Sequence, residues 1–424
     1  MTCIENGSET KFEFRVPPVA TLARAWVGRS SPHALASVAT SEPMSIISTT
    51  ARSAYFHVPF CAHRCGYCDF TLIAGRDDLI GDYLRSLELE LTRALPETET
   101  VELDTLFFGG GTPTHPSCEQ LSELFRTVAT RFRLAPDAEI SVEANPLDLT
   151  DEKIALLADS GVNRVSLGVQ SFSSDALTLL ERDHSTADID AVLRRLRQRC
   201  TNISLDLIFG VPGQSLEDWR LTLRQALEQE PQHISTYGLT WETGTAFGTR
   251  RDRGELTPID EGLERDQYAQ AIEELEQAGY EHYEISNFAR PGFRCRHNEI
   301  YWSGDEYFAF GPGAARYLNG RRETNIRSVL GWLARIERGE SPVADAEELE
   351  PVHRARELLF LGLRRREGID CDDFRRRTGL NLAEFAHEPI QQNQTRGWLE
   401  VTDTGIRLTR EGRFVADRVV ADFL

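Results

Sequence analysis

Long hydrophobic runs are the clearest absence from this 424-residue sequence. No segment approaches the ~20 consecutive apolar residues that a membrane-spanning helix needs. The N-terminus also lacks the charged segment followed by an apolar segment that marks a secretory signal. These absences argue against a membrane-spanning or secreted protein, and we expect a cytoplasmic one.

Lysine is almost missing as well, since it occurs only at Lys11 and Lys153. Nearly all of the 47 basic residues are therefore arginine, and 67 acidic residues give a formal net charge of -20. A chain this acidic is not drawn to nucleic acid or to anionic lipid by long-range attraction. We expect no nucleic-acid partner, and any other partner must bind a local patch.

Cysteines are not spread along the chain, as a secreted disulfide framework would require. There are eight, and three of them, Cys61, Cys65 and Cys68, fall within eight residues. A metal site is therefore the better interpretation of this cluster.

The length and a hydrophobic content of 40% allow a large core and predict roughly two to three domains. Residues 1–50 show no sustained hydrophobic period and contain many Ser, Ala, Thr and Pro residues. We expect a poorly ordered extension there. Met44 leaves open whether residues 1–43 are translated at all.

Short apolar runs alternate with amphipathic helical segments after residue 50, which predicts an α/β fold with a parallel sheet. The helical segments carry apolar residues at i, i+3, i+4 and i+7. Ser173, Thr186 and Ser215 occupy expected N-cap positions. The pattern leaves open a doubly wound sheet or a barrel, and in both cases ligands gather at the carboxyl ends of the strands. The predicted strands are 54–58, 104–108, 139–143, 164–168, 203–209 and 233–239.

The last part of the chain predicts a smaller α+β unit. A helix begins at Pro351, a second covers 372–377, and two strands at 398–401 and 406–409 precede a closing helix. Helices followed by a two-stranded wing suggest a winged-helix-like domain. Residues 351–424 hold 13 Arg against 12 acidic residues, so no basic face for DNA stands out.

The three clustered cysteines follow the first strand with the spacing C-x3-C-x2-C. Three thiolates bind three irons of a [4Fe-4S] cluster and leave the fourth iron open to an exchangeable ligand, whereas an electron-carrying cluster usually has four cysteines. Structural zinc is the alternative, with His57 or His63 as the fourth ligand.

Glycines and polar residues follow the other strands. Gly109, Gly110 and Gly111 end the second strand, where bare backbone allows a ligand close approach. No Gly-Lys-Ser/Thr follows, so this is not a phosphate-binding P-loop. Polar residues accompany the later strands: Glu143 and Gln170 follow two of them, Arg182 comes after the next helix, and Asp206 lies inside the apolar run 204–209.

Together these motifs resemble the radical S-adenosylmethionine (radical SAM) family of oxygen-independent coproporphyrinogen dehydrogenases and their relatives. The motifs are Tyr55-x-His-x-Pro-Phe-Cys61, Gly109-Gly-Gly-Thr-Pro113, Ser141-Val-Glu-Ala-Asn-Pro146, Ser166-Leu-Gly-Val-Gln-Ser-Phe172 and Asp206-Leu-Ile-Phe-Gly-Val-Pro-Gly-Gln214. The resemblance implies a partial (β/α)6 barrel with a [4Fe-4S] cluster at its mouth. It divides the chain into an extension (1–50), a core barrel (51–245), a family-specific extension (246–345) and a winged-helix-like domain (346–424). It also implies that S-adenosylmethionine contacts Tyr55, Tyr67, Gly110, Gly111, Thr112, Glu143, Gln170, Arg182 and Asp206.

Two features resemble the haem chaperone branch of this family. The dehydrogenases continue to a further cysteine two positions after the third, where this chain has Phe70. The branch also carries a His-Asn-x-x-Tyr-Trp motif, here from His297 to Trp302. The resemblance implies a b-type haem with His297 as a candidate axial ligand and Tyr301 and Trp302 as flat contacts. Cys295 is a rival ligand, and a purely structural histidine is the other alternative.

The chaperone interpretation implies haem transfer to acceptor haemoproteins, membrane respiratory enzymes among them, and hence peripheral contact with the inner face of the membrane. The alternative is an oxygen-independent coproporphyrinogen III dehydrogenase, which would oxidatively decarboxylate its substrate. A third hypothesis is a radical enzyme for another substrate, without haem affinity. The sequence leaves open the acceptor, the oligomeric state, covalent haem attachment and cleavage of S-adenosylmethionine.

Overall fold

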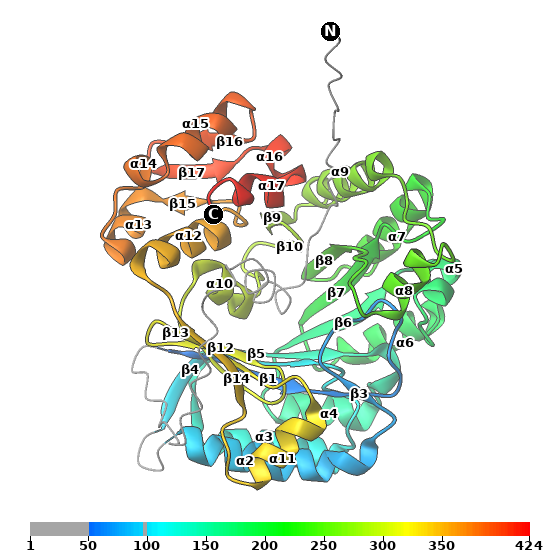
Figure 1. Cartoon of the computed structure of the whole chain (residues 1–424). Coiled ribbons are helices and arrows are strands. Elements are labelled where there is room, and N and C mark those ends of the chain that lie inside the picture. Colours follow the sequence, from blue (N-terminus) through cyan, green and yellow to red (C-terminus); the bar gives the residue numbers. More distant parts are fainter. Residues whose placement is uncertain (1–50, 96–99) are drawn as a thin grey trace.

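The computed structural model describes residues 51–95 and 100–424. The extension expected over residues 1–50 lies outside the described residues, and so does the question raised by Met44. The remainder forms a large sheet with helices around it and a smaller domain at the C-terminal end (Figure 1).

Six strands pair in parallel and in chain order, as predicted for a barrel rather than for a doubly wound sheet, whose strand order reverses at its centre. All six predicted segments are strands. They are β1 (Ser53–Val58), β4 (Val101–Gly110), β5 (Phe132–Ala144), β6 (Arg164–Gln170), β7 (Asn202–Phe209) and β8 (His233–Gly238). The fold prediction, an α/β partial barrel, is confirmed.

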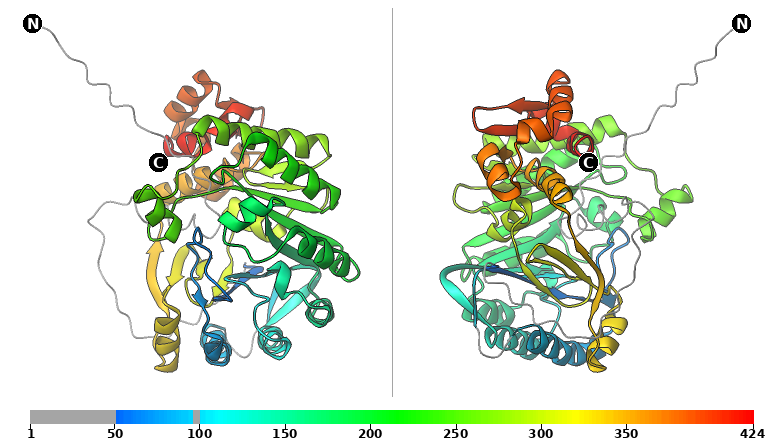
Figure 2. Two further views of the ribbon diagram at one scale, coloured as in Figure 1. Left: turned by 90° about the vertical axis from the view of Figure 1, so that its right-hand side faces the viewer. Right: turned by 60° about the vertical axis from the view of Figure 1, so that its left-hand side comes forward.

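The helices between these strands lie along the outside of the curved sheet (Figures 1 and 2). Their apolar stripes cover the sheet; α2, for example, buries Leu84, Leu87 and Leu91. The helices are α2 (Ile80–Ala94), α3 (Cys118–Ala129), α4 (Asp151–Asp159), α5 (Ser174–Leu179), α6 (Thr186–Leu196) and α7 (Leu216–Glu228), with short 3-10 turns η1 (Asp77–Leu79) and η2 (Pro146–Asp148).

Two of the three predicted N-caps are confirmed, because Ser173 and Ser215 accept hydrogen bonds from the first turns of α5 and α7. The prediction for Thr186 is wrong by one residue. The Ser185 hydroxyl accepts from the Asp188 backbone, and the Asp188 carboxylate accepts from the Ser185 backbone. This reciprocal capping box satisfies two backbone donors at once, which Thr186 inside the helix cannot do.

Segments from the less regular middle of the chain complete both edges of the sheet. β9 (Glu281–Glu284) and β10 (Asn287–Ala289) form a hairpin that pairs antiparallel with β8, and β11 (Phe308–Phe310) lies parallel to β1. The same region contains α8 (Ala246–Asp252), α9 (Glu261–Gln277), α10 (Arg296–Ser303) and α11 (Val329–Glu337). A second sheet contains β12 (Ala315–Leu318), β13 (Arg321–Asn325) and β14 (Val343–Glu348), so the boundary expected after residue 345 falls inside β14. The division into units stays a prediction.

The C-terminal unit has one more strand than expected. Its sheet has the order β15-β17-β16, so β15 (Ile369–Asp370) adds to the predicted wing of β16 (Leu399–Val401) and β17 (Gly405–Leu408). A strand of only two residues, such as β15, shows no hydrophobic period in the sequence and could not be predicted from it. The helices are α12 (Pro351–Gly362), α13 (Cys371–Thr378), α14 (Leu382–Phe385), α15 (His387–Thr395), α16 (Arg410–Phe414) and α17 (Ala416–Ala421).

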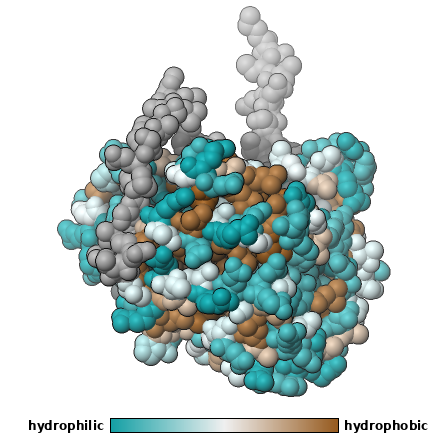
Figure 3. All heavy atoms as spheres, turned by 90° about the horizontal axis from the view of Figure 1, so that it is seen from below, coloured by the Kyte–Doolittle hydropathy of each residue, from teal (hydrophilic) through white to brown (hydrophobic). Residues whose placement is uncertain are grey.

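Over the described ranges, no helix combines the length and apolar character needed to cross a membrane. The large exposed hydrophobic side chains come from many different elements, among them Leu89, Leu221 and Leu330. On the face seen from below, hydrophobic residues are interspersed with hydrophilic ones (Figure 3). Single exposed apolar side chains of this kind are normal on a protein surface.

Candidate functional site

A cavity of about 380 Å³ opens at the carboxyl ends of the parallel strands and extends under α10. The structure brings all thirteen predicted site residues together along its wall. They are Tyr55, Cys61, Cys65, Tyr67, Cys68, Gly110, Gly111, Thr112, Glu143, Gln170, Arg182, Asp206 and His297. The roles of these residues stay predictions, while their convergence on one cavity is an observation.

The cysteine loop follows β1 through the two-residue strand β2 (Phe60–Cys61), which pairs with β3 (Ile73–Ala74) and holds the base of the loop closed. The Thr112 hydroxyl lies 3.2 Å from the Cys61 sulfur, and Arg182 donates to the Cys65 sulfur at 3.5 Å. Burial raises the pKa of Cys61 to about 11 and that of Cys68 to about 12. Thiolates in such a site need positive partners, which Arg182 and the irons of a cluster would provide.

The zinc alternative needs a histidine as the fourth ligand, and both candidates are engaged elsewhere. His57 Nε2 lies 2.6 Å from the Thr71 carbonyl oxygen, and its Nδ1 lies 3.0 Å from the Tyr55 hydroxyl. His63 Nε2 lies 3.1 Å from the Glu181 carbonyl oxygen. In the part of the chain that the structure describes, no group of three or more His, Cys, Asp or Glu side chains is arranged to hold a single metal ion.

The glycine loop packs directly against the strand that leads to the cysteines. The Gly111 N–H donates to the Val58 carbonyl at 2.8 Å. A Cβ at Gly111 would lie 2.8 Å from the Phe60 carbonyl oxygen, and one at Gly110, whose φ is 120°, would lie 2.7 Å from the His57 ring. Glycine is therefore required here for close packing and for backbone conformation, in addition to any approach of a ligand.

Two partly buried carboxylates face the cavity across the sheet. Glu143 accepts a hydrogen bond from the Gly110 N–H at 3.0 Å, and Asp206 accepts one from the Ser166 hydroxyl at 3.1 Å. Burial, together with the nearby Asp206 charge, raises the pKa of Glu143 to about 7, and burial also raises the pKa of Asp206. A bound ammonium or a pair of hydroxyl groups would stabilise their ionised forms.

Arg182 supplies the matching positive charge. Its guanidinium donates to the Gly168 carbonyl at 3.1 Å, while its buried Nε has no hydrogen-bond partner among the described residues. A buried donor without a partner is costly, so this atom fits a ligand carboxylate. Gln170, at the end of β6, has a φ of 65° and follows an irregularity in the pairing of β6 with β7. Such backbone strain is typical of ligand sites.

The two predicted tyrosines differ in their surroundings. The Tyr55 ring packs at 6.1 Å from that of Phe107, and burial raises its pKa well above the usual value. The Tyr67 ring meets that of Phe247 edge-on at 6.0 Å. Both rings thus present apolar surface to the cavity wall beside the cysteine loop.

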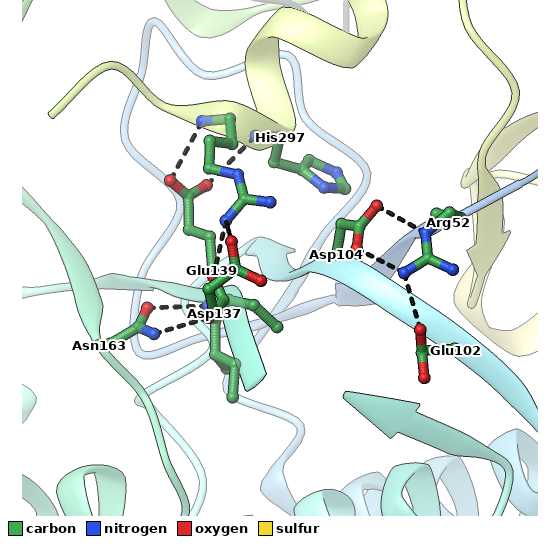
Figure 4. Close-up of polar contacts among 10 residues, drawn as sticks. Arg52, Glu102, Asp104, Asp137, Glu139, Asn163 and His297 are labelled. Carbon is green, nitrogen blue, oxygen red and sulfur yellow. Dashed lines mark hydrogen bonds and ion pairs between the residues drawn. The ribbon is translucent and has the colours of Figure 1, made fainter. Parts of the chain in front are cut away.

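Helix α10 is tied to the barrel at its first turn by Glu139 of β5 (Figure 4). The Glu139 carboxylate accepts from the N–H groups of Arg296 at 3.1 Å and His297 at 3.2 Å, and the Cys295 sulfur lies 3.6 Å from it. A carboxylate at a helix N-terminus satisfies free donors and the helix dipole together. Cys295 is fully buried and does not line the cavity, unlike its rival His297.

Both ring nitrogens of His297 are engaged. Nδ1 lies 2.8 Å from the Thr105 hydroxyl, and Nε2 lies 2.8 Å from the Tyr301 hydroxyl. The ring stacks on Phe107 at 5.1 Å. Burial, with a contribution from the Arg164 charge, lowers the pKa of His297 to about 3, so the ring is neutral. As it stands, this geometry is that of a satisfied structural histidine that borders the cavity.

The cavity also has a wall that the sequence analysis missed. Aromatic rings and arginines of the second sheet and α12 line it beside α10, where Arg354 lies over the Tyr317 ring at 4.4 Å. Burial lowers the pKa of Arg354 to about 10. These residues lie in short strands and in a helix far along the chain, with no spacing that links them to the cysteines. They are Tyr307, Tyr317, Arg322, Arg354 and Phe360, and from the barrel Arg164 and Tyr237 also contribute.

A partial barrel whose first strand leads into a three-cysteine loop defines a radical SAM protein. The sequence agrees, since the Radical SAM superfamily pattern matches residues 55–226 and the HemN C-terminal domain matches residues 349–415. This membership implies a [4Fe-4S] cluster and S-adenosylmethionine.

Proteins of similar sequence indicate which family of radical SAM proteins the chain belongs to. The chain is 36% identical to "Heme chaperone HemW" of Bacillus subtilis over 88% of this chain and 99% of that protein. It is 31% identical to "Radical S-adenosyl methionine domain-containing protein 1, mitochondrial" of Bos taurus over 91% and 90% of the two chains. The chain therefore belongs to the HemW family of radical SAM proteins. The solved coproporphyrinogen III oxidase HemN of Escherichia coli shares its fold, with a TM-score of 0.77, 22% identity and 91% of each chain covered.

Proposed function

We propose that this protein is a haem chaperone that holds one b-type haem per chain and transfers it to acceptor haemoproteins. The observation that carries the proposal is that His297, Tyr301 and Trp302 of α10 line the same cavity as the three cysteines. Phe70, where the dehydrogenases continue to a further cysteine, lines this cavity too. The relatives that carry the name of haem chaperones support it further.

Haem would lie on the α10 side of the cavity. Tyr301 and Trp302 offer aromatic surface to the porphyrin. Arg322 and Arg354 both pair with Glu357 and would share their charge between this carboxylate and the haem propionate groups. If His297 binds the iron through Nε2, its hydrogen bond to Tyr301 must open first. Acceptors in the respiratory membrane would be reached by a cytoplasmic protein at its inner face.

The cysteine side would hold the other two groups. Cys61, Cys65 and Cys68 would bind the cluster, and Glu143, Gln170, Arg182 and Asp206 offer the anions, amide and cation that S-adenosylmethionine matches. Tyr55, Tyr67, Gly110, Gly111 and Thr112 would complete this side. The cluster supplies electron transfer and an open iron when bound.

The test is an anaerobic haem titration of the cluster-reconstituted chain, followed by visible absorption. We expect saturable one-to-one binding that weakens in His297→Ala and is unchanged in His387→Ala, whose side chain is exposed and outside the cavity. A parallel incubation with coproporphyrinogen III, dithionite and S-adenosylmethionine tests the alternative, a dehydrogenase. Turnover without haem binding would refute the chaperone proposal. The absence of both haem binding and turnover would indicate a radical enzyme for another substrate.

A further inference from the structure

A second cavity of about 160 Å³ lies where the C-terminal domain meets the edge of the large sheet. Its walls come from β9, from the residues after α12, and from β16, β17 and the first turn of α16. None of the predicted site residues lies there. Six arginines line it: Arg364, Arg365, Arg366, Arg407, Arg410 and Arg413.

This concentration of positive charge stands out in a chain of net charge -20. Only two carboxylates, Glu284 and Glu400, are part of the described lining. Glu400 is paired with Arg407 at 2.5 Å, and Glu284 accepts from the Ser286 N–H at 3.1 Å. Arg364, Arg366 and Arg410 pair with Asp417, Glu276 and Glu273, which lie outside the lining. Among the residues that the structure describes, Arg365 and Arg413 have no ion pair, so the positive charge at the cavity exceeds the negative charge around it.

Arg413 is the clearest case. Within residues 51–95 and 100–424 it forms no ion pair, and its Nη1 donates to His282 Nδ1 at 2.8 Å. His282 Nε2 lies 3.1 Å from the Ile285 carbonyl oxygen and must carry the ring proton, so Nδ1 accepts. The partner of Arg413 is thus neutral. Burial, with the Arg413 charge, lowers the pKa of His282 to about 3 and keeps the ring neutral.

Arg364 forms the inner wall of the cavity. Its side chain is buried, one nitrogen pairs with Asp417 at 3.1 Å, and its Nε has no hydrogen-bond partner among the described residues. The guanidinium also lies over the Trp302 ring at 5.1 Å. A buried guanidinium with an unfilled donor, beside a second one without an anion, is a receptor for an oxyanion.

We propose that this cavity binds a phosphate-type oxyanion, either inorganic phosphate or the phosphoryl end of a small molecule. A tetrahedral anion presents oxygens in several directions, which matches guanidinium groups that come from the residues after α12 on one side and from α16 on the other. The exposed Arg366 and Arg410 stand at the entrance, and Arg364 and Arg413 form the base.

The experiment is calorimetric titration of the full, cluster-reconstituted chain in chloride buffer, with inorganic phosphate and with pyrophosphate as probes at matched ionic strength. We expect saturable one-to-one binding that weakens at least about tenfold in Arg413→Gln, since one charge-assisted contact is lost. Arg413→Lys, which keeps the charge, should bind with intermediate affinity. Arg376→Gln, an exposed arginine on α13 outside this cavity, should bind like the parent protein.

Tighter binding of pyrophosphate indicates a phosphorylated small molecule, and equal binding indicates free phosphate; both support the proposal. No saturable heat with either probe, or equal weakening in Arg376→Gln, overturns it. Thermal melting in chloride shows whether Arg413→Gln is folded, and Arg413→Lys carries the test if it is not. Haem titration of the same samples is scored separately, because this site does not depend on the chaperone proposal.

Discussion

The two sides of the main cavity differ in how ready they are for a ligand. On the cysteine side, the Arg182 Nε lacks a partner and two carboxylates sit in surroundings that disfavour their charge. On the α10 side, His297 is neutral, buried and hydrogen-bonded through both ring nitrogens. The cysteine side gains contacts when a ligand enters, whereas the α10 side must lose a hydrogen bond of His297 before this residue can bind a ligand.

This difference suits a protein that must release what it binds. Opening the hydrogen bond between His297 and Tyr301 costs about 1 kcal/mol, and on the proposed function this cost would lower haem affinity and favour transfer to an acceptor with an unengaged ligand. On the proposed function, the cysteine side is a permanent site and the α10 side a temporary one. Each prediction below changes one side and asks whether the other follows.

The largest effect is expected from Cys65→Ser. A [4Fe-4S] cluster needs all three thiolates, so iron and sulfide should fall from about four each per chain to near zero after reconstitution. Haem affinity should stay within about twofold, because α10 is held by Glu139 and Thr105 rather than by the cysteine loop. Iron and sulfide analysis and a haem titration measure both.

Cys371→Ser is the control for this change, since Cys371 is exposed and outside the cavity. It should retain full cluster content. If Cys65→Ser lost haem binding together with the cluster, the two sides would act as one site, and the distinction between them would be wrong.

A smaller effect is expected from Tyr301→Phe. This change removes the hydroxyl that occupies His297 Nε2 and keeps the ring, so haem affinity should rise by up to about tenfold, the value of one hydrogen bond. Tyr280→Phe is the control, because its hydroxyl bonds to the Pro231 carbonyl elsewhere in the fold. A fall in affinity would mean that the Tyr301 hydroxyl itself contacts haem.

The sequence predicts the cysteine side better than the α10 side for a physical reason. Gly110 and Glu143 lie at the ends of the long strands β4 and β5, Asp206 lies within β7, and Cys61 follows β1 by three residues. The period and order of these buried strands fix which residues meet. The wall on the α10 side includes residues of β12 and β13, strands of four and five residues that show no period. Arg354 and Tyr317 could not be placed beside the motif from spacing alone.

The sequence also could not predict which side chains contact one another. The motif identified His297, but only the structure shows that Thr105 and Tyr301 occupy both of its nitrogens, and that Cys295 turns away from the cavity. The arginines of the second cavity were hidden by the nearly equal numbers of Arg and acidic residues in 351–424, because a total does not show which charges meet.

The last effect concerns Glu143, whose titration should make the stability of the cysteine side depend on pH. Its pKa is raised from 4.5 to about 7, mainly by burial, so the stability that comes from its neutral form is present below about 4.5 and is lost as pH rises through 7.

Glu143→Gln keeps an acceptor for the Gly110 N–H without the charge. It should stabilise the chain by about 3 kcal/mol at pH 8 and by about 1 kcal/mol at pH 5, in denaturant melts without S-adenosylmethionine. Glu88→Gln, an exposed change on α2, should show no such trend. His297→Ala should show the opposite trend between pH 5 and 8, because the His297 ring stays neutral in the folded chain but takes up a proton in the unfolded chain below about 6.5. The parent protein therefore loses stability as pH falls and this variant does not; a trend of the same sign in both variants would mean that the two sides share one titrating network.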